Sequence, residues 1–111
     1  MNSVSHSIEH ESYFVEDVSQ IHSPSLLIYL DHVKANLGEM ILIAGGPDKL
    51  CPHCKTHKTR EIAQLMLEQG IHNHKAATIA EAEMLASACI PKILIAYQPV
   101  SYTHLTLPTK A

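Results

Sequence analysis

The sequence predicts an α/β fold in which helices alternate with the strands of a parallel sheet. Short extended segments are followed by helical segments of about 10 to 15 residues, in the order β-α-β-α-β-α-β, and this alternation is typical of βα units. Glycines stand where the first two predicted helices end. With 46% apolar residues, one Phe and no Trp, the core has to be aliphatic.

The first predicted unit starts with SLLIYLD, residues 25–31, a compact apolar run of strand length. Asp31 is suited to cap the helix that follows, because its carboxylate accepts the free N–H groups of a first turn. Four apolar residues form one side of this helix: Val33, Leu37, Met40 and Ile41. The run Gly45-Gly46-Pro47 is expected to end it.

The second unit repeats this pattern. An extended segment over residues 50–57 precedes a helix for which Thr59 is the expected cap. The inward stripe of this helix is expected to contain Ile62, Leu65, Met66 and Gln69. Gly70 fits the C′ position, where a left-handed backbone ends a helix.

The third unit consists of a short strand over residues 74–78 and a helix over residues 80–89, followed by the apolar strand KILIAY at residues 92–97. Met84 and Leu85 are expected in the helix core. Cys89, at the end of this helix among apolar neighbours, is expected to be a small core residue.

Three regions differ in pattern. Residues 1–22 lack sustained periodicity and are expected to form a polar tail, whereas residues 23–100 carry the predicted fold. Residues 101–111 have no helical stripe where a fourth helix is due. The string VSYTHLTLPT also resembles the conceptual translation of a sequencing-library adapter, so we expect residues 101–111 not to be native.

Composition narrows the class of protein. A net charge of −3 gives no indication of nucleic acid or of an anionic membrane as a partner. The N-terminus has no apolar core flanked by basic residues, as a signal peptide has, and no apolar run approaches the ~20 residues of a membrane helix. Three cysteines, an odd number, favour reduced thiols over a disulfide framework. We therefore expect a cytoplasmic protein.

The string CPHCKTHK, residues 51–58, offers three chemistries. The first is a thiol-disulfide redox site, because CxxC near a βαβ pattern occurs in thioredoxin-like proteins. In those proteins the first Cys starts a helix, whereas here Cys51 and Cys54 fall within the expected extended segment. Three strand residues separate their Cα atoms by ~10 Å, beyond the ~7 Å limit of a disulfide. The redox interpretation is therefore the weaker alternative.

The second chemistry is zinc binding. Its possible ligands in the string are Cys51, His53, Cys54 and His57. A four-ligand site normally takes a second ligand pair at some distance, and the only other cysteine is Cys89. We therefore expect no metal site in this chain.

The third chemistry rests on strand parity. In an extended segment His53, Lys55 and His57 share one face with Cys51, and the other residues lie on the opposite face. In a parallel barrel, residues near the carboxyl end of a strand reach the mouth of the active site. Burial and neighbouring positive charge lower the pKa of a lysine in such a place, which frees its amine for Schiff-base formation. Lys55 is the candidate.

Six landmarks carry a family resemblance. They are PSLLIYLD, AGG, PHCKTHKTREIA, EQGI, KAATIAEAEMLA and ILIAYQPV. In this order they resemble the D-threonine aldolase and D-serine dehydratase family over about residues 23–100. That family shares the N-terminal barrel of alanine racemase, which is fold type III among pyridoxal-phosphate enzymes. The resemblance implies a partial (β/α)8 TIM-type barrel with about three and a half of the eight βα units, because a whole barrel takes ~250 residues.

The resemblance also implies roles for individual residues. The first lysine of PHxKTHK, which is Lys55 here, carries pyridoxal 5'-phosphate as a Schiff base. His53 and His57 are implied to pack against the cofactor ring or to tune it, and Thr78 and Tyr97 to line the same mouth. Cys51 is a departure, because the family usually has Arg there.

The function implied is that of a pyridoxal-phosphate-dependent lyase acting on a D-amino acid, of the D-threonine aldolase or D-serine dehydratase type. Its parent is expected to be longer, to form a homodimer, and to hold any divalent metal in a C-terminal β domain that this chain lacks. The isolated chain is then expected to be inactive. A non-enzymatic pyridoxal-phosphate carrier with the same barrel is the alternative, followed by the CxxC redox protein.

Overall fold

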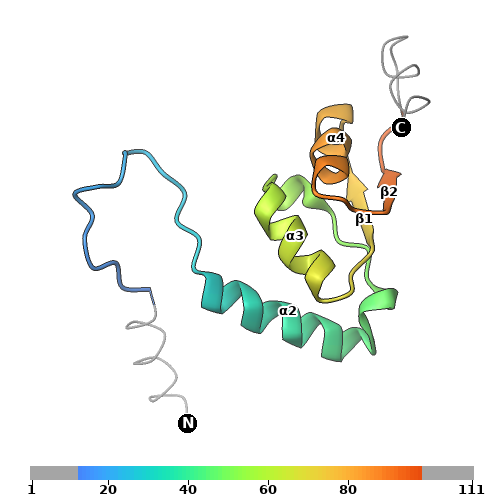
Figure 1. Cartoon of the computed structure of the whole chain (residues 1–111), viewed down its shortest axis with the longest axis horizontal. Helices are drawn as coiled ribbons and strands as arrows, with labels where there is room; N and C mark the ends of the chain where they lie inside the picture. Colours follow the sequence, from blue (N-terminus) through green and yellow to red (C-terminus); the bar gives the residue numbers. More distant parts are fainter. Residues whose placement is uncertain (1–12, 99–111) are drawn as a thin grey trace. The chain divides into compact units, whose positions relative to one another are not determined.

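The computed structural model describes residues 13–98 (Figure 1). Contacts divide the chain into two compact units, Met1–Val33 and Lys34–Ala111, and each is described by itself. The helices are α2 (Leu30–Ala44), α3 (Arg60–Glu68) and α4 (Ile79–Ser87), and the strands are β1 (Asn73–Ala76) and β2 (Lys92–Ile95). Two short 3-10 turns, η1 (Pro47–Lys49) and η2 (Cys54–Thr56), complete the regular structure of the described residues.

In the first unit, the strand expected over residues 25–31 does not form. Residues 25–29 have no regular structure, and the helix already begins at Leu30, so Asp31 lies in its first turn rather than at its cap. A single extended segment has no backbone partner of its own, so an apolar run alone does not make a strand. Aromatic residues link the two ends of this unit: Tyr13 stacks on His32 at 4.5 Å between ring centroids, and the Tyr29 hydroxyl donates to the Tyr13 carbonyl at 2.9 Å.

The end of α2 and its apolar side follow the prediction. Leu37 is buried, and its expected companions on that side are half-buried. Beyond Ala44 the chain turns through Gly45 and Gly46, both with positive φ, into η1. No helix among residues 13–98 has the length and apolarity to span a membrane.

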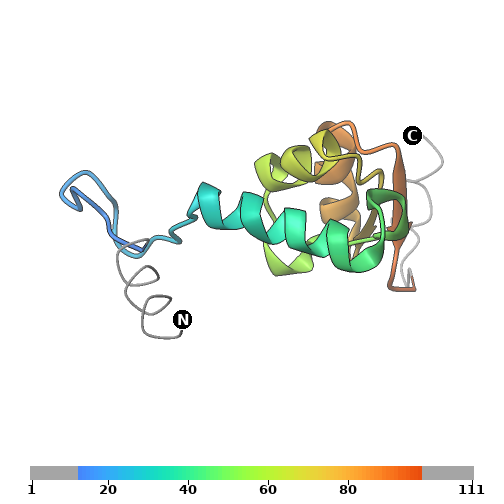
Figure 2. The same ribbon diagram turned by 90° about the horizontal axis from the view of Figure 1, so that it is seen from below.

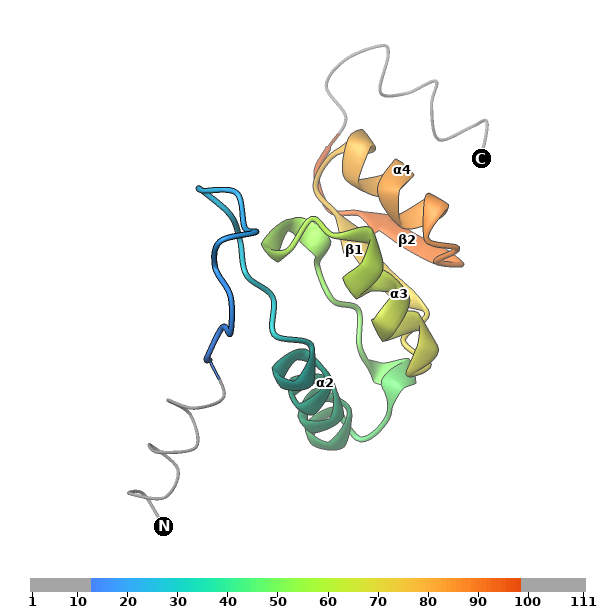
Figure 3. The ribbon, with the colours of Figure 1, turned by 60° about the vertical axis from the view of Figure 1, so that its left-hand side comes forward.

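The sheet of the second unit is parallel, as predicted. β1 and β2 pair in register from Asn73 with Lys92 to Ala76 with Ile95. On the other side of β1, His53 forms an isolated parallel bridge with Lys75, whose N–H donates to the Pro52 carbonyl at 2.8 Å. Three neighbouring chain segments therefore run parallel in sequence order. Helices α3 and α4 lie side by side on one side of the strands (Figures 2 and 3).

The extended segment predicted over residues 50–57 ends early. After His53 the chain closes into η2, in which the His53 ring accepts the Lys55 N–H at 3.2 Å and the Cys54 carbonyl accepts the Lys58 N–H at 2.7 Å. Lys58 has a φ of 49°, which reverses the chain before α3. The alternation of side chains between the two faces of a strand therefore stops at His53, and it does not determine where the side chains of Lys55 and His57 lie. The reason is that the local bond from the Lys55 N–H to the His53 ring competes with the backbone hydrogen bonds of a sheet.

The core lies between the helices and the sheet. Its buried members are Cys54, Ala63, Ala76, Leu85, Ala88 and Ile90, with Met84 and Ile93 packed against them. Leu85 and Met84 thus occupy the expected positions. In α3, Ile62 and Met66 are buried as predicted, but Gln69 is an exposed C-cap.

Cys89 is exposed, contrary to the prediction. It follows the C-cap residue Ala88 and has a φ of 66°, so the left-handed backbone turns its side chain outward. Ala88 and Ile90 on either side take the buried places instead. The fold class is α/β with a parallel sheet, which residues 13–98 make with two strands and one bridge where four strands were predicted.

Candidate functional site

Three of the five sequence-predicted site residues come to one edge of the sheet. Lys55 follows the parallel segment that ends at His53, Thr78 follows β1 and Tyr97 follows β2. Because parallel strands end at the same edge, all three residues come to the carboxyl edge of the sheet. Lys55, Thr78 and Tyr97 are exposed there. The topology therefore brings the three to one edge, although it does not place their side chains in contact.

Two lysines of the CPHCKTHK string differ in their surroundings. The Lys58 ammonium forms an ion pair of 2.7 Å with Oε2 of Glu81. Lys55 is exposed, and in the part of the chain that the structure describes its ammonium has no hydrogen-bonding or ionic partner. The burial expected for Lys55 is absent: the residue lies in the short turn η2, not in a strand, and is exposed. Of the two amines, that of Lys58 is engaged in an ion pair and that of Lys55 is not.

Glu81 is the buried acidic residue beside this edge. Its side chain is 7% exposed, and Oε1 accepts the Ala77 N–H at 2.9 Å while Oε2 accepts from Lys58. The hydrogen bond from Lys58, followed by that from Ala77, lowers the Glu81 pKa from 4.5 to about 2. The carboxylate is therefore charged at neutral pH.

Sequence reasoning missed Glu81, although a signal was present. Thr78 caps α4 by accepting the Glu81 N–H at 3.1 Å, and Glu81 reaches back to the N–H of Ala77, next to the cap. The string TIAE is thus a variant of the capping box, the pattern T-x-x-E at a helix start. The Thr78 hydroxyl, predicted to line a cofactor site, is used in this cap.

Cys54 lies in the core at 0% exposure, and its Sγ is 3.4 Å from Oε1 of Glu81. Burial, together with the hydrogen bond and the charge of Glu81, raises the thiol pKa to about 11. Reactive redox cysteines have the opposite property, a lowered pKa and an accessible sulfur. Cys51 is exposed, and all three cysteines are free. These features disfavour the CxxC redox interpretation.

The imidazole of His74 is buried and that of His57 is half-buried. The pKa of His57 and that of His74 are both lowered, in each case chiefly by burial. Nδ1 of His57 accepts the Thr59 N–H at 2.9 Å, and Nε2 of His74 lies 3.0 Å from the Ile71 carbonyl. Their other ring nitrogens are buried without a partner among the described residues. His57 therefore holds the start of α3, a role that the sequence did not indicate.

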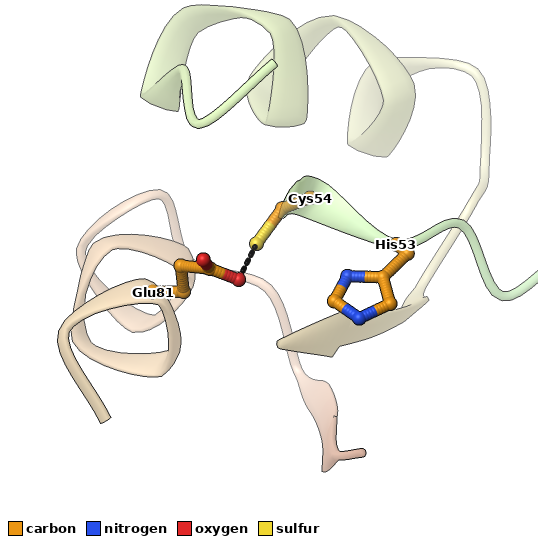
Figure 4. Close-up of side chains that lie close together, drawn as sticks. All are labelled: His53, Cys54 and Glu81. Carbon is orange, nitrogen blue, oxygen red and sulfur yellow. Dashed lines mark hydrogen bonds between the residues drawn. The ribbon is translucent and has the colours of Figure 1, made fainter. Parts of the chain in front are cut away.

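One cluster combines three kinds of metal-ligand atom. A ring nitrogen of His53, Sγ of Cys54 and a carboxylate oxygen of Glu81 all lie within 4.8 Å of one another (Figure 4). The first two come from the turn that precedes α3 and the third from the first turn of α4. Cys54 and Glu81 are buried, whereas His53 is half-buried.

Comparison with protein-family models, with curated protein sequences and with solved structures finds no match for this chain.

Proposed function

We propose that this chain is part of a pyridoxal-phosphate-dependent lyase acting on a D-amino acid, of the D-threonine aldolase or D-serine dehydratase type. In this proposal the amine of Lys55 attaches covalently to the cofactor. The observation that carries the proposal is the state of Lys55, an exposed and unpaired amine of the described chain just beyond the carboxyl end of a parallel segment. Lysine amines form Schiff bases with carbonyl groups such as that of pyridoxal phosphate, and an amine without a partner is available for this reaction.

The arrangement of elements supports a partial (β/α)8 barrel as the fold of the parent. Three parallel segments follow one another in sequence order, and α3 and α4 cover the same side. A barrel has all its helices on the outside, whereas a doubly wound sheet has helices on both faces. The opposite face, with Lys92 and Leu94 exposed, corresponds in this proposal to the barrel interior.

Pyridoxal phosphate supplies an electron sink for carbanion chemistry at the amino acid Cα when it is bound. The residues of this chain supply the attachment point and its surroundings. Lys55 holds the cofactor, and the His53 ring keeps the turn closed by accepting the Lys55 N–H. Tyr97, exposed beyond the end of β2, is available at the same edge. Barrels commonly build their phosphate site from the loops after strands seven and eight, so turnover belongs to a longer parent.

A cytoplasmic location is part of the proposal, and the three free cysteines are its support. A non-enzymatic pyridoxal-phosphate carrier with the same barrel differs in one outcome. It binds the cofactor through the same lysine without turning over D-amino acids. Turnover of D-threonine or D-serine by a parent carrying this segment distinguishes the two.

Selective labelling tests the lysine assignment on the chain itself. The full chain is incubated with increasing pyridoxal phosphate, reduced with borohydride, and digested so that mass spectrometry locates each modified lysine. We expect Lys55 to be labelled at a concentration at least about tenfold lower than the exposed Lys34 and Lys49, which serve as internal references.

Two variants complete the test. Lys55→Arg should remove the low-concentration labelling, and Lys49→Arg should leave it unchanged. Labelling of Lys55 at the same concentration as Lys34 and Lys49 contradicts the proposal, because an ordinary surface amine would then explain the reaction.

A further inference from the structure

His53, Cys54 and Glu81 offer a set of donor atoms that sequence spacing did not reveal. Nitrogen, sulfur and oxygen donors lie within 4.8 Å of one another and come from two elements far apart in the chain (Figure 4). The carboxylate stands 27 residues beyond the cysteine, so a search for a second Cys or His pair could not find it.

The distances suit a single small cation. Zinc binds sulfur at about 2.3 Å and nitrogen or oxygen at about 2.0 to 2.2 Å, so donors in a tetrahedral site lie roughly 3.3 to 3.8 Å apart. Sγ of Cys54 and Oε1 of Glu81 are 3.4 Å apart, within that range. The half-buried His53 ring has to approach by about 1.5 Å at most, which is within reach of a side-chain rotation.

The carboxylate is already oriented by neighbours. The Ala77 N–H holds Oε1 at 2.9 Å, and the Lys58 ammonium holds Oε2 at 2.7 Å. Such outer partners fix the direction of a ligand, and their loss commonly weakens metal binding about 10 to 100-fold. Once the ion displaces the thiol proton, the thiolate and the carboxylate together carry two negative charges, against the one positive charge of Lys58, so a divalent cation is favoured.

We propose that His53, Cys54 and Glu81 form a binding site for Zn²⁺, with the fourth coordination position open to solvent. The ion takes the place of the thiol proton that lies between Sγ and Oε1, and this proton passes to solvent. No oxidation is involved. When His53 binds the ion, its hydrogen bond from the Lys55 N–H is lost. A neutral imidazole has one lone pair to offer, so a ring bound to metal has no acceptor left at Nδ1.

This inference opposes the sequence-based expectation of no metal site in the chain. It does not rest on the proposed function, because none of the three ligands is Lys55. Since His53 is half-buried and not fully enclosed, its side offers the entry path for the ion.

Cobalt titration tests the site. The full chain, stripped of metal by a chelator and kept reduced, is titrated with Co²⁺, whose bond to a thiolate gives a charge-transfer absorption in the near ultraviolet. We expect this band to saturate at one equivalent, to disappear on addition of Zn²⁺, and to be absent from Cys54→Ser. The variants Cys51→Ser and Cys89→Ser, which change exposed cysteines, should retain it.

A second pair of variants covers the case in which Cys54→Ser fails to fold. His53→Gln alters a half-buried ring, and we expect it to keep the circular dichroism of the wild type while weakening Co²⁺ binding at least about tenfold. Lys55→Arg should bind Co²⁺ as the wild type does. Failure of Lys55 labelling together with retained Co²⁺ binding would remove only the proposed function.

Two results overturn the proposal. One is the absence of the thiolate band from the folded wild type. The other is a band that disappears in Cys51→Ser and persists in Cys54→Ser, which would assign the binding to the exposed Cys51.

Discussion

Replacing the buried Glu81 by Gln removes one charge while keeping the shape of the side chain. The variant loses the 2.7 Å ion pair with Lys58, and its amide oxygen still accepts the Ala77 N–H. Cys54, which donates to Oε1 from 3.4 Å, keeps an acceptor as well. We therefore expect Glu81→Gln to fold but to be less stable than the wild type.

The size of the loss follows from the pKa of Glu81. A decrease from 4.5 to about 2 corresponds to an upper limit of about 3.5 kcal/mol, at about 1.4 kcal/mol per pKa unit. Lys58 is 64% exposed, so solvent screens the ion pair and reduces its share to about 1 kcal/mol or less. The Ala77 bond to a charged acceptor exceeds one to a neutral acceptor by about 1 kcal/mol. We expect a loss of about 1 to 2 kcal/mol.

The pH dependence identifies the cause. The folded pKa of Glu81 is below its unfolded value, so its contribution is complete above pH 4.5 and disappears as the pH falls to about 2. Urea denaturation of the wild type and the variant at several pH values measures this difference. Glu83→Gln, at an exposed position of the same helix, is the matched control and should change stability by less than about 0.5 kcal/mol. A difference between wild type and Glu81→Gln that stays constant from pH 7 to pH 2 refutes the reasoning.

Three further outcomes follow from burial and backbone geometry. Leu85→Ala, at 0% exposure, should lower the free energy of unfolding by about 2 to 5 kcal/mol in urea denaturation, whereas Leu42→Ala, at 75% exposure, should change it by less than about 0.5 kcal/mol. Gly70→Ala should lower the melting temperature, because φ is +90° and the new Cβ would lie 3.2 Å from a proline ring, while Gly38→Ala in the open helix interior should raise it; equal shifts would contradict this. Iodoacetamide should modify the two exposed cysteines of the native chain and reach Cys54 only after unfolding, as followed by mass spectrometry, and equal rates at all three would show that the core is not formed.

The α/β class, the parallel strands and the helix ends could be predicted because they depend on local pattern. The stripe of α3 predicts Ile62 and Met66 as buried residues, and both are. Gly70 follows α3 with a positive φ, as a C′ glycine does. The strand expected over residues 25–31 did not form, because an apolar run becomes a strand only where a neighbour supplies hydrogen bonds.

The site was predictable only in part. The PHCKTHK string singled out Lys55, and its position beyond a parallel segment follows from chain order. Its surroundings did not follow, because the bond from the Lys55 N–H to the His53 ring ends the extended segment and with it the strand parity.

Taken alone, the sequence determined the order of the helices and the parallel strands and the helix ends, and it singled out CPHCKTHK as the candidate segment. Only the tertiary structure decided which of its side chains are free and which are engaged. It brought Glu81 to Cys54 and Lys58 from more than 20 residues away, so that one lysine is paired, one cysteine is buried, and Lys55 remains exposed. The physical reason is that charge pairing and burial depend on distances across the fold, which spacing along the chain does not contain.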